Sequence, residues 1–223
     1  MRLLTEPSQR ENSRDDEKGT ITLDTPKGPV LIYPQCTPGF FRDLRLDSGL
    51  GHFSHYSSII QKLEVFEKIA SGKDGRVSLG LVEDKVVVAY GVGYYPDSTE
   101  RWSRLGDLMY EVAAIEVSRH YRNMKIADVL LAEMVNDELF EQKILYMNGY
   151  SWHWDLDGKG LTMIQYRKMM MNFFRKHGFQ EYYTNEPNIA IREENLFMAR
   201  IGSKVSPEDQ QRFRNLRFGI VNR

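Results

Sequence analysis

The sequence has little cysteine and no long apolar run. Its one cysteine, Cys36, stands among 223 residues and cannot form a disulfide within the chain, which is typical of proteins from a reducing compartment. No apolar stretch approaches the ~20 residues that a helix needs to cross a bilayer. The N-terminus also lacks the apolar segment of a signal peptide. We therefore expect a cytoplasmic protein without membrane spans.

An excess of one charge is also absent. The chain carries 30 Lys and Arg against 31 Asp and Glu, and its formal net charge is −1. This balance offers no basic footprint for nucleic acid or for an anionic membrane, so neither is an expected partner. The five histidines and the cysteine form no pattern of metal ligands, so no metal is expected.

The length of the chain fits one domain with a core of good size. Residues 1–18 are polar and carry both charges, and we predict a flexible tail there. We predict a single domain over residues 19–223. The oligomeric state is left open, since no feature of the sequence bears on it.

Strand and helix patterns alternate along the predicted domain. Runs of β-formers predict strands at 20–23, 30–33, 76–82, 86–95, 111–117, 143–150, 182–183 and 195–201. Apolar residues at helical spacing predict helices at 56–70, 126–134, 161–176 and 207–217. This order indicates an α/β (α+β) fold in which helices flank a mixed sheet of six to seven strands.

Two polar or glycine-containing segments interrupt this order. Gly91-x-Gly93 lies inside a predicted strand with no helix after it, so it indicates a bulge or a close contact rather than a dinucleotide-binding turn. The stretch from Pro96 to Asp107 is polar, and we expect a loop there.

The stretch Glu111–Met134 predicts a strand, a short basic turn at 118–125 and a helix in direct succession. The unpaired N–H groups at a helix N-terminus and the positive end of the helix dipole favour a bound anion such as phosphate. A plain strand followed by a core helix is an equally good interpretation of these residues alone.

The same stretch resembles the L-x-V…Y-R-G-x-G-I-G/A signature of the GNAT acetyltransferase superfamily, through Ile115-Glu-Val117, Tyr121-Arg122 and Ile126-Ala127. The resemblance implies a GNAT fold with splayed central strands and acetyl-CoA as the acetyl donor. It implies that the strand holds the pantetheine arm and the turn holds the pyrophosphate. The donor-binding residues implied in this way are Ile115, Val117, Arg122, Asn123, Met124, Lys125, Ile126 and Ala127.

The turn departs from that signature at two positions. The superfamily usually has glycines where this chain has Asn123 and Lys125. Asn tolerates the left-handed backbone conformation better than other non-glycine residues. The long side chain of Lys125 could either block a pyrophosphate or neutralise it, and the sequence leaves both possibilities open.

Segments further along the chain resemble a narrower group, the acetoin-utilisation protein A family of GNAT acetyltransferases. The most specific of them are Trp152-His-Trp-Asp155 and Met198-Ala-Arg-Ile-Gly202. The resemblance implies a protein lysine acetyltransferase that inactivates acetyl-CoA synthetase. Such a switch is physically reasonable, because acetylation removes the charge of a lysine and its ability to pair with an anionic substrate.

Glu111 is the first candidate for the general base that acetyl transfer to an amine requires. It precedes Arg122 by 11 residues. In the superfamily that the chain resembles, the catalytic glutamate of the histone-acetylating branch has this same spacing. In a regular strand it shares a face with Ala113, Ile115 and Val117, and apolar neighbours raise the pKa of a carboxyl group. A glutamate at a solvent-exposed strand end is the alternative.

Two further residues are candidates for the same role. Regular alternation places Glu116 on the face opposite Glu111, where it is a second candidate base or an ion-pair partner. His153 and Asp155 are predicted to share one face of an extended segment, with the two tryptophans on the other. They indicate an oriented base, a surface that receives the substrate protein, or a structural aromatic cluster.

The group that protonates the departing thiolate is missing from its usual place. Many members of the superfamily have a tyrosine where this chain has Phe174. Tyr166 or water could replace it. Two alternatives to the lysine acetyltransferase therefore stay open: a small-amine acetyltransferase, and a non-catalytic protein that binds acyl-CoA and inhibits the synthetase by binding.

Overall fold

The computed structural model describes residues 19–51 and 62–220. The predicted tail, residues 1–18, and the first part of the helix predicted from Tyr56 lie outside the described residues. The division into a tail and one domain over residues 19–223 therefore stays a prediction.

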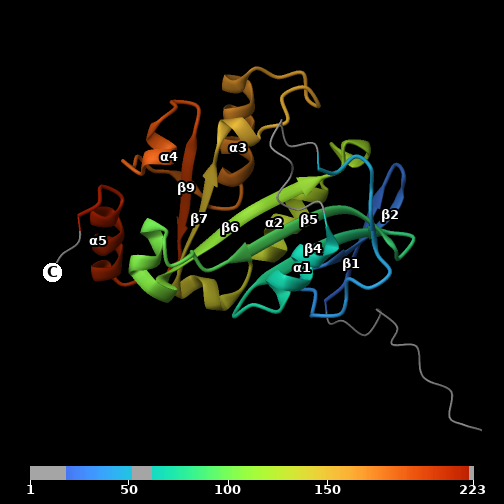
Figure 1. Cartoon of the computed structure of the whole chain (residues 1–223), viewed down its shortest axis with the longest axis horizontal. Helices are drawn as coiled ribbons and strands as arrows, with labels where there is room; N and C mark the ends of the chain where they lie inside the picture. The colour runs from blue at the N-terminus through green and yellow to red at the C-terminus, as the bar shows by residue number, and fades with distance from the viewer. Residues whose placement is uncertain (1–18, 52–61, 221–223) are drawn as a thin grey trace, which may run out of the picture.

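One mixed β-sheet organises the described chain (Figure 1). The strands are β1 (Ile21–Thr25), β2 (Gly28–Tyr33), β3 (Arg45–Leu46), β4 (Arg76–Val82), β5 (Val86–Tyr94), β6 (Met109–Val117), β7 (Ile144–Gly149), β8 (Gln180–Glu181) and β9 (Leu196–Ile201). Their order is β1-β2-β4-β5-β6-β7-β9-β8, and β3 pairs with β5 outside this path. Most neighbours are antiparallel, whereas β6 with β7 and β3 with β5 are parallel.

The sheet has nine strands rather than the predicted six to seven. The difference comes from β3 and β8, which have two residues each and are too short to carry a recognisable alternation. The strand predicted at Tyr182–Tyr183 is wrong in position, since β8 lies just before it. The ring of Tyr182 instead packs edge-on against Phe213, with 5.5 Å between the ring centroids.

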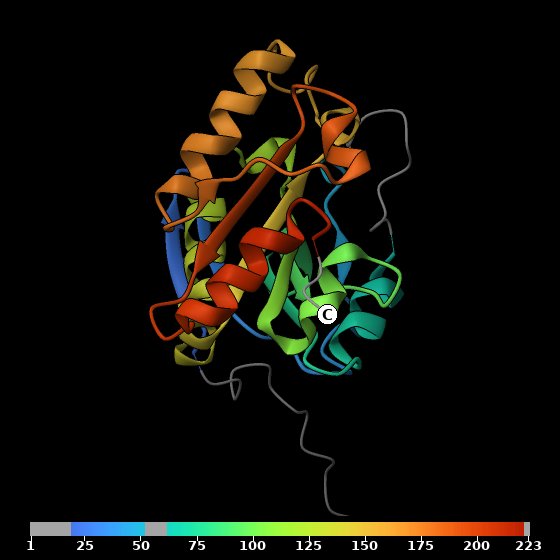
Figure 2. The same ribbon diagram turned by 90° about the vertical axis from the view of Figure 1, so that its left-hand side faces the viewer.

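The α-helices cover both faces of the sheet. They are α1 (Leu63–Ala70), α2 (Ile126–Val135), α3 (Met163–Arg175), α4 (Pro187–Ala190) and α5 (Pro207–Leu216). On one face, Phe66 of α1 packs against Tyr90. On the other, Met134 of α2 and Phe174 of α3 join one core cluster, and Figure 2 places α3 and α1 on opposite sides of the sheet. No helix in the described part of the chain has the length and apolarity needed to span a membrane.

The segment predicted as a polar loop, Pro96–Asp107, is a loop only in its first part. Residues Arg101–Leu108 form short 3₁₀ turns. Trp102 is buried there, because its ring stacks on Phe197 at a centroid distance of 4.3 Å. Trp102 and Leu105 are the two large apolar residues in this polar stretch, and two residues are too few to establish a helical periodicity.

The central strands β6 and β7 separate after a short parallel contact. They pair only at Met109 with Ile144, Tyr110 with Leu145 and Glu111 with Tyr146. Because α2 connects them as a crossover, their parallel direction agrees with the prediction. The splayed central strands and the mixed, helix-flanked sheet confirm the predicted GNAT fold class. The gap between the strands leaves the facing edge of β6 without a neighbouring strand after Glu111.

A β-bulge lies next to this gap. Val92 of β5 pairs with Ala114 and Gly93 pairs with Val112, so Ala113 is an extra residue in β6. Gly93 suits the close approach, because a Cβ atom there would lie 2.7 Å from the Tyr110 ring. The prediction of a bulge or a close contact at Gly91-x-Gly93 is confirmed: the register shifts between Val92 and Gly93, with the extra residue in β6, and Gly93 lies close to Tyr110.

Candidate active site

A cavity of about 890 Å³ occupies the gap between β6 and β7. Its walls include Val65 and Ile69 of α1 on one face of the sheet and Met170 and Phe173 of α3 on the other. The cavity therefore extends through the sheet from one face to the other. Its size lies in the range of cavities that hold a cofactor or a small substrate.

The basic turn between β6 and α2 lines one end of this cavity. Asn123 has a φ of 64° and Lys125 a φ of 62°, both in the left-handed region that glycine adopts most easily. The two positions where the chain lacks the glycines of the signature thus keep a glycine-like backbone. The side chain of Lys125 is exposed, so it does not fill the turn.

The N-terminus of α2 opens toward the same end of the cavity. Within the described residues, no side chain caps α2, whereas Thr162 caps α3 and Ser206 caps α5. Ile126 and Ala127, the first residues of α2, line the cavity. Uncapped N–H groups at a helix N-terminus are suited to bind an anion.

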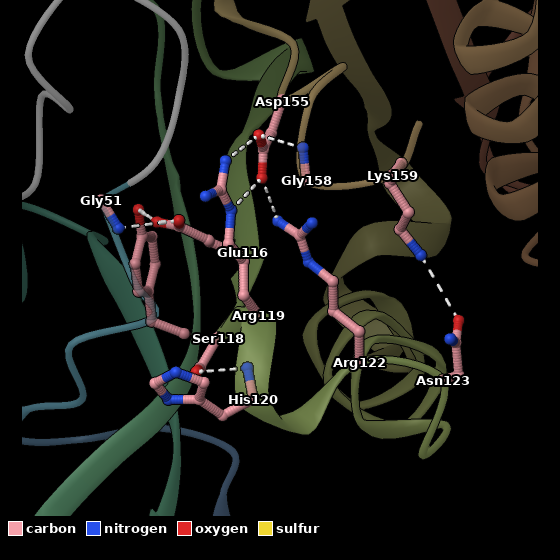
Figure 3. Close-up of polar contacts among 11 residues, drawn as sticks. Gly51, Glu116, Ser118, Arg119, His120, Arg122, Asn123, Asp155, Gly158 and Lys159 are labelled. Carbon is pink, nitrogen blue, oxygen red and sulfur yellow. Dashed lines mark hydrogen bonds and ion pairs between the residues drawn. The ribbon is translucent and has the colours of Figure 1, made fainter. Parts of the chain in front are cut away.

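Asp155 binds the two arginines of the turn (Figure 3). It accepts hydrogen bonds from Arg122 Nη2 at 2.6 Å and from Arg119 Nε at 2.9 Å and Nη2 at 2.5 Å. Burial opposes ionisation of Asp155, but the bonds from the arginines outweigh it and lower the pKa of this carboxyl group to about 2. The remaining terminal nitrogen of Arg122, Nη1, is buried and has no hydrogen-bond partner in the described part of the chain.

Further cations surround this end of the cavity. Its walls include Lys125, Lys159, Lys168 and Lys176. Burial, with some repulsion from Arg122, lowers the pKa of Lys159. The concentration of ammonium and guanidinium groups near the N-terminus of α2 is suited to a ligand with several phosphate charges.

The bulge determines which way the two candidate glutamates face. Glu111 pairs with Tyr94 and Glu116 pairs with Tyr90. Directly paired residues point to the same face, and two residues four positions apart in β5 share one face. Both glutamates therefore lie on the face that α1 covers. The predicted opposite faces are wrong, because the extra residue Ala113 reverses the alternation between them.

The same reversal corrects the predicted neighbours of Glu111. Ile115 pairs with Gly91 and Val117 pairs with Ala89, so these two side chains lie on the opposite face, with α2. Both still line the cavity, as expected for residues that hold a donor molecule. The environment of Glu111 is formed by other parts of the chain.

Glu111 is buried where β6 and β7 separate, with 8% of its surface exposed. The Asn148 side chain of β7 donates a hydrogen bond of 3.0 Å to its Oε1 atom. Burial and, to a lesser extent, repulsion from Glu100 raise the pKa of Glu111 to about 8, although the bond from Asn148 opposes this rise. The raised pKa agrees with the prediction. Asn148 and Tyr94 line the cavity, whereas Glu111 itself does not. The carboxyl group therefore lies behind the cavity wall, in contact with it through Asn148.

Glu116 has both carboxylate oxygens engaged. The Tyr90 hydroxyl donates to Oε2 at 2.7 Å, and the backbone N–H of Gly51 donates to Oε1 at 2.8 Å (Figure 3). The residue is 5% exposed and lines the cavity. These bonds fix the loop at Gly51 against the sheet, so Glu116 has a structural role in addition to its place in the cavity wall.

His153 lies in a 3₁₀ turn, Ser151–His153, rather than in the predicted extended segment. The turn separates the two tryptophans: Trp152 stacks on Tyr150 at 4.9 Å and Trp154 on Tyr166 at 5.2 Å between ring centroids. Burial lowers the pKa of His153, which lines the cavity. The predicted pairing of His153 with Asp155 is not supported, because the carboxylate of Asp155 is held by the arginines.

Comparison with known proteins identifies the family of the chain. The chain is 34% identical over 198 residues to the acetoin utilization protein AcuA of Bacillus licheniformis, a match that covers 88% of this chain and 92% of that protein. The chain belongs to the AcuA family. A second AcuA, from Bacillus subtilis, is 37% identical over 157 residues, which are 70% of this chain and 74% of that protein. No protein-family model matches the chain.

A solved structure extends the AcuA comparison to the fold. The acetoin utilization protein of Exiguobacterium sibiricum superposes with a TM-score of 0.81 at 31% identity, and the match covers 90% of this chain and 93% of that one. The family resemblance that Trp152–Asp155 and Met198–Gly202 indicate is thus confirmed.

One residue of this AcuA-family site, Asn148, and one set of ion pairs were not predicted from the sequence. Asn148 was detectable in principle, since it is the one side chain with a hydrogen-bonding amide in the otherwise apolar run Ile144–Gly149, and a buried amide needs a partner. The pairing of Asp155 with Arg119 and Arg122 had no signal in the sequence, because more than 30 positions separate the partners.

Proposed function

We propose that this protein is an acetyltransferase that moves the acetyl group of acetyl-CoA to a lysine side chain of acetyl-CoA synthetase and thereby inactivates that enzyme. The observation that carries the proposal is a buried carboxyl group, Glu111, with a pKa of about 8. It is hydrogen-bonded to Asn148 in the wall of a cavity whose other end is cationic. The synthetase as substrate rests on the family resemblance, and a cytoplasmic location rests on the single cysteine and the lack of a long apolar run in the sequence.

The residues at the cationic end fit the donor. A CoA molecule carries several phosphate charges, and the uncapped N-terminus of α2, with Ile126 and Ala127, would hold its pyrophosphate. The buried Nη1 atom of Arg122 has no partner in the described chain, so it is a donor that a bound phosphate would satisfy. When bound, acetyl-CoA would supply the activated acetyl group.

The splayed edge of β6 fits the remainder of the donor. Among the described residues, no strand pairs with the backbone of β6 on the side of β7 after Glu111. Its N–H and C=O groups around Ile115 and Val117 are therefore free to pair with an extended ligand as an added strand would. Ala113 and Ala114 are small and allow a ligand to approach this edge.

Glu111 is the proposed general base. A lysine must lose a proton before its amine can attack, and its unperturbed pKa is roughly 10.4. A carboxylate whose pKa is about 8 accepts this proton far more readily than an ordinary carboxylate. Glu116 is less suited, because Tyr90 and Gly51 occupy its oxygens. His153 is a third candidate, as it lines the same cavity.

The non-catalytic alternative loses one of its two supports. It rested on the missing glycines of the turn and on Phe174. The left-handed backbone at Asn123 and Lys125 supports a turn that works without glycine. Phe174 packs against Phe179 in the core. Phe174 and Tyr166 both line the cavity, and Tyr166 provides a hydroxyl group near the site.

The test is the intact mass and the residual activity of purified acetyl-CoA synthetase after incubation with this protein, with and without acetyl-CoA. A mass gain of one acetyl group that requires acetyl-CoA and follows inactivation is expected. Inhibition without a mass gain would support the non-catalytic alternative. A parallel assay with a free polyamine tests small amines, and turnover there without modification of the synthetase would contradict the proposed substrate.

A further inference from the structure

The segment that follows β7 returns to the turn before α2 and closes over it (Figure 3). Asp155 in this segment is 4% exposed. Its carboxylate bonds to Arg119 and Arg122, and it also accepts a hydrogen bond from the backbone N–H of Gly158 at 3.0 Å. One buried carboxylate thus ties both arginines of the turn to a segment more than 30 positions away in the sequence.

The backbone at Gly158 allows this close contact. A Cβ atom on Gly158 would lie 2.2 Å from Asp155 Oδ2 and 2.6 Å from both Arg119 Nε and Arg122 Nη1. Real Cβ atoms do not approach other atoms so closely, so a larger residue would displace the cluster. The two arginines are thus held by the carboxylate of Asp155, and the main chain at Gly158 packs directly against the three side chains.

The negative charge of Asp155 is unexpected where an anion binds. It lies beside Arg122, and by charge alone it weakens the attraction of the turn for phosphate. Its effect on the geometry of the turn instead favours phosphate binding. A guanidinium that is held by a carboxylate keeps one orientation, and Arg122 then presents a fixed donor.

We propose that Asp155 is a positioning residue for donor binding. Itself held by Arg119, it keeps Arg122 in the orientation that receives the phosphates of acetyl-CoA. This inference rests on the proposed function. It also links the donor end of the cavity to the segment that carries Trp152 and His153, because Asp155 belongs to the same segment.

Calorimetric binding of CoA to the whole protein tests the inference, since charge and geometry predict opposite results for Asp155→Asn. If Asp155 acts only through its charge, the variant binds CoA more tightly. If it positions the arginines, the variant binds at least about tenfold more weakly. The matched control is Asp157→Asn, which removes the same charge from an exposed residue nearby and is expected to change the affinity by less than about twofold.

Two other variants separate positioning from folding. Gly158→Ala keeps every charge and is expected to weaken CoA binding as Asp155→Asn does. Asp155→Glu restores a carboxylate and is expected to recover part of the affinity. In steady-state assays, Asp155→Asn should raise KM for acetyl-CoA and leave kcat and KM for the acceptor within about twofold. A general loss of structure would instead lower kcat, which circular dichroism and a melting curve would reveal.

CoA binding by the parent protein separates a failure of the positioning role from a failure of the proposed function. If the parent protein does not bind CoA, the proposed function itself is wrong. If the parent binds CoA and Asp155→Asn binds it equally or more tightly while folded, the positioning role is wrong.

Discussion

Asn148 of β7 donates a hydrogen bond of 3.0 Å to Glu111 of β6 just beyond the last backbone pair that joins the two strands. The bond therefore bridges the start of the gap in the sheet. It favours the charged form of Glu111, whereas burial favours the neutral form, and burial is the stronger effect. The proton affinity of Glu111 depends on the balance between these two effects.

Removal of the Glu111 carboxyl group should abolish most of the activity. For Glu111→Gln we expect kcat/KM to fall by roughly 10²-fold or more, as for the loss of a general base, with CoA affinity unchanged. Glu193→Gln is the matched control, since Glu193 is exposed. Initial rates and calorimetry check the prediction. Activity of Glu111→Gln equal to that of the control would exclude Glu111 as the base.

The rate should depend on pH through Glu111. Its carboxylate form accumulates as the pH rises through about 8, so kcat/KM should increase over this range. In Asn148→Leu the stabilising hydrogen bond to the charged form is lost, and the midpoint should move to higher pH. A pH–rate profile with the same midpoint in both proteins would contradict this assignment.

Stability should depend on pH through the same group. The pKa of Glu111 is about 8 in the folded protein against an ordinary value of 4.5. The contribution of its proton to stability is therefore complete below about 4.5 and is lost as the pH rises through 8. Between pH 5 and pH 9 the parent should lose more stability than Glu111→Gln in urea titrations. Parallel stability curves for the two proteins would be inconsistent with the raised pKa.

The left-handed conformation of Lys125, with a φ of 62°, should be detectable by substitution. Lys125→Gly should stabilise the fold by about 1 kcal/mol, because glycine has no Cβ atom to strain. Lys125→Ala is the control, since alanine keeps the Cβ atom and should leave stability nearly unchanged. Chemical denaturation checks both variants. Equal stabilisation by glycine and alanine would refute the conformational cause.

The bulge in β6 beside Glu111 requires a glycine at position 93 of the neighbouring strand, β5. A Cβ atom at Gly93 would lie 2.7 Å from the Tyr110 ring and 3.0 Å from the carbonyl oxygen of Glu111. Gly93→Ala should therefore destabilise the protein by about 1–3 kcal/mol. At Gly80 the nearest atoms would be side-chain atoms at 3.3 Å, so Gly80→Ala should cost less. Urea unfolding of the two variants measures the difference.

Much of the local structure could be predicted from the sequence. The strand, turn and helix between Glu111 and Met134 follow from the periodicity of apolar residues, which is a local property. The tolerance of Asn123 for a left-handed backbone is also local. The family follows from short motifs, of which Trp152–Asp155 and Met198–Gly202 are the most specific.

The candidate site could be predicted only in part, because its chemistry depends on contacts between distant segments. The bulge at Ala113 comes from the register between β5 and β6, and it brings Glu111 and Glu116 to one face against the expected alternation. The Tyr90 hydroxyl then donates a hydrogen bond to the carboxylate of Glu116. This register cannot be predicted from the residue pattern of either strand alone.

The sequence by itself thus determined the order of the elements, the fold class and the family, because each depends on residue types and spacings along the chain. The tertiary structure decided which side chains meet: Asn148 with Glu111, and Asp155 with Arg119 and Arg122. Burial and hydrogen bonding set the proton affinity of a carboxyl group, and both exist only once these distant segments are packed together.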